Sequence, residues 1–179
     1  MQDHPLVYII YGLAMAAFFE ETARLVFFKW LEKKRSLEKA DALAYGLGHG
    51  GLELIFLGLT SLLNLYIVLS AVQTQNPQVM QLLSENMLKT IQSLSVWQIY
   101  LLGFERILAL GLTVWVYQAV RQKKWIYLLA AYGLHAFFDL APSLSQVGWL
   151  TNPVLVEVIL ALELVLVAYG TKEIFCKKS

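Results

Sequence analysis

The feature that most constrains the fold of this chain is a series of five long apolar stretches. They cover residues 5–30, 42–72, 96–120, 125–140 and 153–170 of the 179-residue sequence. A helix needs about 20 mostly apolar residues to cross the hydrocarbon core of a bilayer. We therefore expect an all-α, polytopic transmembrane bundle of about five spans, in which residues 1–179 form a single domain embedded in the cell membrane.

The overall composition supports a membrane protein and argues against other classes. The chain is 58% hydrophobic and only 15% charged, whereas a soluble domain carries about a quarter charged residues. A formal net charge of +1 gives no support to nucleic-acid binding. The single cysteine, Cys176, excludes a disulfide framework and a cysteine-based zinc ribbon. The expected surroundings are membrane lipid, and no nucleic acid is expected as a partner.

The basic residues predict the orientation of the bundle. They follow the first, third and fifth apolar stretches: Lys29, Lys33, Lys34, Arg35 and Lys39; Arg121, Lys123 and Lys124; and Lys172, Lys177 and Lys178. The connectors on the other side contain only Lys89. Because positive charge favours the cytoplasmic side of a membrane, we expect the N-terminus outside and the C-terminus in the cytoplasm.

The connector over residues 73–95 has its own pattern. Its apolar residues recur at roughly helical spacing, among them Leu82, Leu83 and Met87. Such a segment suits an amphipathic helix that lies on the membrane surface. We expect an interfacial helix here, on the outer side.

Ionisable residues inside the apolar stretches mark a candidate functional site. Such groups are costly in a bilayer and are functional hypotheses by default. Six of them form i,i+4 pairs, each of which shares one helix face: Glu20 with Arg24, His49 with Glu53, and His135 with Asp139. At about 1.5 Å per residue, Glu20, His49 and His135 lie about 11–15 Å from the expected cytoplasmic ends of their helices. Three helices therefore bring an acid and two imidazoles to one level.

Other ionisable residues of the spans are weaker candidates for the functional site. Glu21 follows Glu20 about 100° further around the helix, so one of the two is expected to be structural. Glu105 and Arg106 suit a packing ion pair, and they are candidates for a supporting role next to the site. We expect at most one of Glu157 and Glu163 to face the site.

Two catalytic schemes fit these residues. A desolvated glutamate can act as general base and acid towards a water molecule. Alternatively, histidines and carboxylates can hold a catalytic zinc and leave one position open for water. The sequence contains neither HExxH nor GxSxG, so it lacks the usual zincin helix and the usual serine nucleophile. Both the zinc-assisted and the metal-free scheme stay open at this point.

The ordered motifs resemble a known family. They are Glu20-Glu21-Thr22-Ala23-Arg24, then Gly46 to Glu53 (GLGHGGLE), then Glu105-Arg106, then His135-Ala136-Phe137-Phe138-Asp139. This set resembles the YhfC family of intramembrane metalloproteases, which is similar to the CAAX prenyl endopeptidases (ABI group) and the PrsW proteases. The resemblance implies a membrane-embedded endopeptidase with its active site inside the bundle, acting on a membrane-associated peptide or protein.

The resemblance also implies roles for individual residues. Glu20 resembles the water-activating glutamate, with Glu21 beside it and Arg24 orienting the carboxylates. His49 resembles the histidine that binds water or metal. His135 and Asp139 resemble the pair that contacts the metal or the tetrahedral oxygen. The expected metal ligands, for a zinc ion, are His49, His135 and Asp139, and Glu53, Glu105 and Arg106 are the expected supporting residues.

Two functions of other classes stay open on the sequence alone. A transporter or proton-coupled carrier could use the same acids and histidines as a relay. It would need a polar path to both faces, for which Glu105 and Glu157 are the outer-half residues. A catalytically idle binding or immunity-type protein could also use this scaffold.

Overall fold

The computed structural model describes residues 4–74 and 110–176, and every regular element in these ranges is a helix. The elements are α1 (Pro5–Glu32), α2 (Lys39–Thr74), α6 (Trp125–Phe138), α7 (Leu140–Gln146) and α8 (Pro153–Cys176). Residues 110–121 are also helical. The predicted all-α fold is confirmed. The interfacial helix expected within 73–95, most of the third predicted span, and both Glu105 and Arg106 lie outside the described residues.

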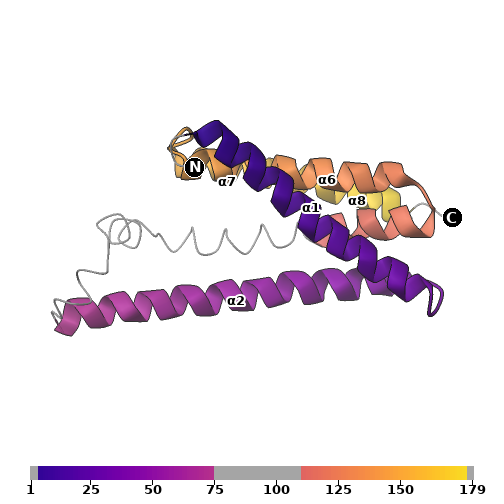
Figure 1. Cartoon of the computed structure of the whole chain (residues 1–179), viewed down its shortest axis with the longest axis horizontal. Helices are drawn as coiled ribbons and strands as arrows, with labels where there is room; N and C mark the ends of the chain where they lie inside the picture. Colours follow the sequence, from indigo (N-terminus) through magenta and orange to yellow (C-terminus); the bar gives the residue numbers. More distant parts are fainter. Residues whose placement is uncertain (1–3, 75–109, 177–179) are drawn as a thin grey trace.

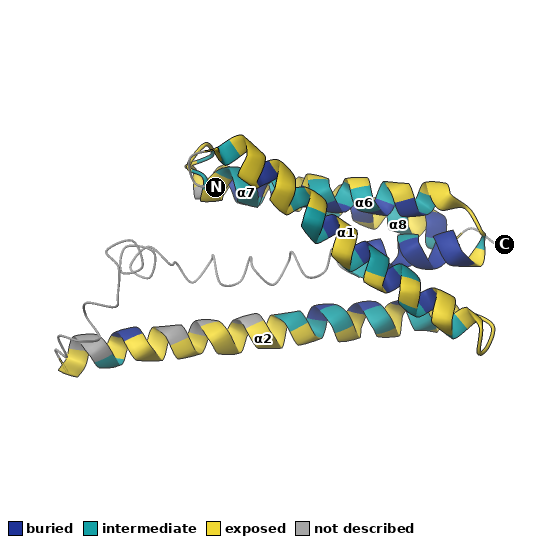
Figure 2. Cartoon of the chain, in the orientation of Figure 1, coloured by how far each residue is buried: buried dark blue, intermediate teal, exposed yellow. Residues whose placement is uncertain are grey.

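Three of the described helices are long and apolar enough to cross a membrane. They are Pro5–Glu32, Lys39–Ser70 and Val154–Cys176, which correspond to the first, second and fifth predicted spans. Large apolar side chains on α2, such as Phe56 and Tyr66, are 70% exposed, and Figure 2 shows that exposed residues dominate the second half of this helix. Apolar surface of this extent is what a bilayer, rather than water, solvates.

The fourth predicted span differs from expectation. The prediction was one helix over 125–140 followed by a connector, but α6 ends at Phe138 and α7 occupies much of that connector. Pro142 explains the interruption at Asp139, because proline has no N–H to donate to the carbonyl of residue 138 and its ring crowds that carbonyl. The two helices together run from residue 125 to 146, about 33 Å at 1.5 Å per residue.

Packing between the helices extends along the bundle, and one core cluster lies at the end where α1 connects to α2. α1 crosses α6 and α7, and α7 packs on α8 (Figure 1). A core cluster combines α1, the start of α2, the 110–121 helix and α6 through Phe28, Ala42, Tyr117 and Leu128. At Gly46 of α2, an added Cβ would lie 3.0 Å from the Leu110 Cα, so glycine permits close approach of the two backbones.

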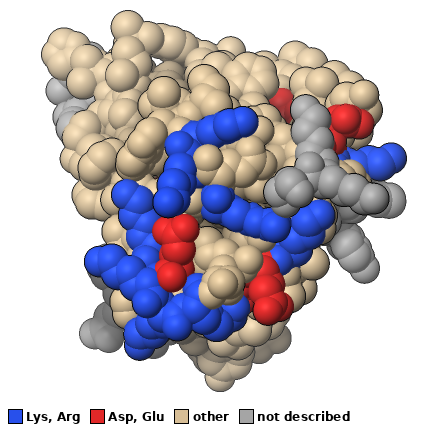
Figure 3. All heavy atoms as spheres, turned by 90° about the vertical axis from the view of Figure 1, so that its right-hand side faces the viewer, with Lys and Arg blue, Asp and Glu red and all other residues tan. Residues whose placement is uncertain are grey.

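The basic segments gather at this same end. The α1–α2 connection, the turn after residue 121 and the end of α8 lie together in Figure 1, and Figure 3 shows lysines and arginines spread over that face. This arrangement agrees with the topology that the charge pattern predicts. The orientation of that end relative to the membrane stays a prediction.

Candidate active site

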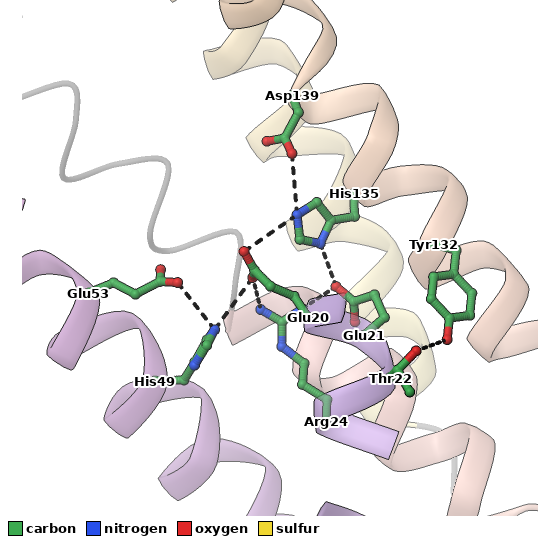
Figure 4. A network of polar contacts seen from close by, with 9 residues as sticks. All are labelled: Glu20, Glu21, Thr22, Arg24, His49, Glu53, Tyr132, His135 and Asp139. Carbon is green, nitrogen blue, oxygen red and sulfur yellow. Dashed lines mark hydrogen bonds and ion pairs between the residues drawn. The ribbon is translucent and has the colours of Figure 1, made fainter. Parts of the chain in front are cut away.

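Side chains from three helices meet in one polar cluster inside the bundle (Figure 4). Three of the residues come from two successive turns of α1, and two come from α2. The last two come from α6 and from the residue that follows it. The cluster residues are Glu20, Glu21, Arg24, His49, Glu53, His135 and Asp139. The convergence that the i,i+4 pairs predict is therefore present in the structure.

Glu20 lies at the centre of the cluster. Its Oε2 atom is 3.4 Å from His49 Nε2 and accepts a hydrogen bond from Arg24 Nη2 at 3.1 Å. Its Oε1 atom is 4.0 Å from His135 Nε2. The side chain is 32% exposed, so this carboxylate contacts both imidazoles and still has an open side.

Glu21 and Arg24 form the buried base of the cluster. Both residues are 0% exposed, and Arg24 Nη1 donates a hydrogen bond to Glu21 Oε1. The Glu21 Oε2 and Arg24 Nε atoms have no hydrogen-bond partner among the described residues. Because Glu21 is enclosed and Glu20 faces both histidines, Glu21 is the one of the two acids that suits a structural role, as the sequence analysis expected of one of them.

His49 lies between two carboxylates. Its Nε2 atom is 3.4 Å from Glu20 Oε2 and also 3.4 Å from Glu53 Oε1. Tyr45, one turn earlier on α2, stacks on the imidazole with ring centroids 5.8 Å apart and an interplanar angle of 18°. The stacking fixes the plane of the ring, so Nε2 points into the cluster.

Glu20, His49 and Glu53 meet the geometric requirement for a metal site. One potential ligand atom from each lies within 4.8 Å of the other two. The expected ligand set was His49, His135 and Asp139, which shares only His49 with this group. In Figure 4, His135 and Asp139 lie on the far side of Glu20 from His49. Glu53, expected only in a supporting role, is thus in a ligand position.

His135 has a different environment from His49. Its Nδ1 atom is 2.7 Å from Glu21 Oε1, and its Nε2 atom is 3.4 Å from Asp139 Oδ2. A buried carboxylate at Nδ1 favours the tautomer with the proton on that nitrogen, which donates it to Glu21. The Nε2 atom faces two further carboxylates, those of Glu20 and Asp139.

A contact between α1 and α6 that the sequence did not reveal holds this geometry. Thr22 Oγ1 and Tyr132 Oη are 2.8 Å apart, and the Tyr132 ring stacks on Phe18 with centroids 6.4 Å apart. Thr22 follows Glu21, and Tyr132 precedes His135 by about one helical turn. The only signal in the sequence was position: Thr22 lies within the first motif, and Tyr132 lies three residues before His135.

The two acids of α8 stand apart from these contacts. No hydrogen bond or ion pair among the described residues joins Glu157 or Glu163 to the cluster. Glu163 is 4% exposed, and its Oε2 atom lacks a hydrogen-bond partner in the described part of the chain. The expectation that at most one of Glu157 and Glu163 faces the site stays a prediction.

Comparison with known proteins gives two matches. The family model described as YhfC intramembrane metalloprotease matches residues 1–160. The protein named uncharacterized membrane protein YhfC from Bacillus subtilis strain 168 is 36% identical over 181 residues, which cover 93% of this chain and 68% of that protein. No solved structure matches the chain. Together with the three long apolar helices, these matches identify a multi-pass membrane protein.

Proposed function

We propose, from the premise that this chain belongs to the YhfC intramembrane metalloprotease family, that it is a membrane-embedded zinc peptidase. In this proposal Glu20, His49 and Glu53 hold the metal ion. His135 takes the proton of the attacking water, and Glu21 and Arg24 hold the side chains of the site in position. The substrate is a peptide bond of a membrane-associated peptide or protein.

The position of His49 Nε2 is the observation that carries the proposal. An imidazole nitrogen offers one proton or one lone pair, and here two carboxylate oxygens each lie 3.4 Å from it, farther than a good hydrogen bond. A cation between the three side chains would instead bind the lone pair and both carboxylates.

The donor set fits zinc. Imidazole nitrogen and carboxylate oxygen are ordinary zinc ligands, and catalytic zinc sites use three protein ligands with a further position open. Bound there, zinc would supply Lewis-acid activation of a water molecule and of the scissile carbonyl. The open side of Glu20, whose side chain is 32% exposed, gives the substrate a route to this point.

His135 is suited to accept the proton. Glu21 accepts the proton of Nδ1, so the neutral form of His135 would present the lone pair of Nε2 to the space beside Glu20, 4.0 Å away. Asp139 Oδ2, at 3.4 Å, stabilises the imidazolium that results. His135 can then return the proton to the leaving amine. These contacts favour Glu20 as a ligand and His135 as the base, the reverse of the roles that the resemblance implied.

The test is proteolysis in a reconstituted membrane. Purified protein in liposomes is incubated with a library of single-span peptides, and new N-termini are identified by mass spectrometry. We expect wild type to cut a subset of peptides, chelation to abolish cutting, and added zinc to restore it. Glu53→Gln should be inactive, whereas Glu157→Gln, which changes an acid of α8 outside the cluster, should be active.

Three results would oppose the proposal. Cutting by chelated, metal-free protein would support the metal-free scheme. Normal cutting by Glu53→Gln would remove that residue from the metal site. Absence of cutting by wild type under all metal conditions, together with proton flux that depends on Glu20, would favour a carrier.

A further inference from the structure

An apolar cavity lies at the basic end of the bundle, away from the polar cluster. Its volume is about 350 Å³, and it is an open cavity lined by the start of α2, the 110–121 helix and the last turns of α8. None of the seven cluster residues lines it. A cavity of this size falls in the range of ligand pockets in proteins.

The cavity has a long apolar wall and a cationic rim. Leu43, Val114, Val167 and Phe175 form part of the wall, and Lys172 belongs to the lining one turn from the end of α8. No hydrogen bond or ion pair joins Lys172 to another described residue. Its ammonium group therefore has all three N–H donors available for a ligand.

A second lysine lies next to the same rim. Lys39 Nζ donates a hydrogen bond to the Phe175 carbonyl oxygen and lies 4.8 Å from the centroid of the Phe175 ring. The contact satisfies a carbonyl at the C-terminal end of α8, where helix carbonyls lack partners. It also keeps a second positive charge at the mouth of the cavity.

Close packing gives the cavity a fixed shape. Gly111 is part of the lining, and an added Cβ there would meet Val167 Cγ1 at 2.6 Å. The 110–121 helix and α8 are therefore in contact at this level, and the cavity lies beside a rigid junction. An apolar slot with a cationic rim, at an end rich in lysine and arginine (Figure 3), matches a molecule with an apolar chain and an anionic head.

We infer that this cavity binds one anionic phospholipid, with an acyl chain along the Val114–Val167 wall and the phosphate at Lys172 and Lys39. The site is separate from the proposed catalytic cluster, and it does not depend on the protein being a peptidase. The lipid would fill the space between α2 and α8 and hold the two helices at a fixed separation.

Native mass spectrometry of the purified full chain tests this inference. Dioleoyl phosphatidylglycerol and dioleoyl phosphatidylcholine, which have the same chains, are titrated separately. We expect one phosphatidylglycerol molecule to be retained about 30-fold better, the ratio expected for two lysines near an anionic lipid. Lys172→Gln should lower that preference to about fivefold, whereas Lys33→Gln, at an exposed lysine beyond α1, should leave it unchanged.

A matched pair of variants separates the cavity from general lipid contact. Ala168 lines the cavity and is exposed to it, while Ala161 lies on the same helix, is also exposed, and does not line it. Ala168→Phe should fill the cavity and lower the retention of phosphatidylglycerol to that of phosphatidylcholine in wild type, or below it. Ala161→Phe should retain phosphatidylglycerol as well as wild type does. Equal retention of both lipids by wild type, or equal loss in both phenylalanine variants, would overturn the inference.

Discussion

His135 Nδ1 lies 2.7 Å from Glu21 Oε1, and this contact joins α6 to a fully buried carboxylate of α1. The same Glu21 oxygen accepts a hydrogen bond from Arg24. One buried oxygen therefore links the orientation of the imidazole to the charge balance of α1.

Removal of the buried guanidinium should be strongly destabilising. Arg24→Leu leaves Glu21 as an enclosed carboxylate without its cationic partner, and loss of one partner of a buried ion pair costs about 3–5 kcal/mol. Unfolding of the purified protein in mixed micelles measures this. Lys33→Gln, at an exposed lysine, should change stability by less than about 0.5 kcal/mol. Equal stability of the two variants would show that Arg24 is not essential to the buried network.

The hydroxyl groups of Thr22 and Tyr132 should stabilise the fold through one shared hydrogen bond. Thr22→Val and Tyr132→Phe each remove one hydroxyl from a hydrogen bond of 2.8 Å with little change in shape. A double-mutant cycle on unfolding should give a coupling of about 0.5–1.5 kcal/mol, the net value of one such bond. Strict additivity of the two changes would show that the hydroxyls do not interact in the membrane.

Two glycines of the GLGHGG segment should respond in opposite ways to alanine. Gly46→Ala places a methyl group 3.0 Å from the Leu110 Cα and should separate the two helices and lower stability. Gly48→Ala meets nothing within 4 Å and should raise helix stability by up to about 1 kcal/mol. Thermal unfolding of both variants in the same detergent checks the signs. The same sign in both would contradict the packing at Gly46.

Pro142 should control the direction of α7 relative to α6. Pro142→Ala restores an N–H that can bond to the carbonyl of residue 138, so α6 and α7 should join into one helix. We expect α7 to lose its packing on α1 and α8 and proteolysis to fall. The bound metal and the Asp139–His135 contact of 3.4 Å should be retained, because these two residues are an i,i+4 pair on one helix face. Spin labels at the outer ends of α6 and α7 would report the straightening. Pro153→Ala, at the first residue of α8, is the control, because proline at that position removes no helical hydrogen bond.

The sequence predicted the helical class, the long spans and the level at which acids and imidazoles meet. Apolar length and i,i+4 spacing determine these features within single helices. Contacts between helices were harder to predict, because they depend on rotation and crossing angle. Hence the approach of Glu53 to Glu20, the contact of His135 Nδ1 with Glu21 and the Thr22–Tyr132 bond emerged only from the structure. The break after Phe138 had a local signal in Pro142 that apolar length alone does not register.

Metal content of two histidine variants tests the central claim most directly. Wild type, His49→Ala and His135→Ala are purified, loaded with zinc, and analysed by inductively coupled plasma mass spectrometry. The account predicts about one zinc per wild-type chain, a similar amount in His135→Ala, and loss of zinc in His49→Ala, because the ligands are Glu20, His49 and Glu53. Full zinc in His49→Ala, or equal loss in both variants, would contradict it.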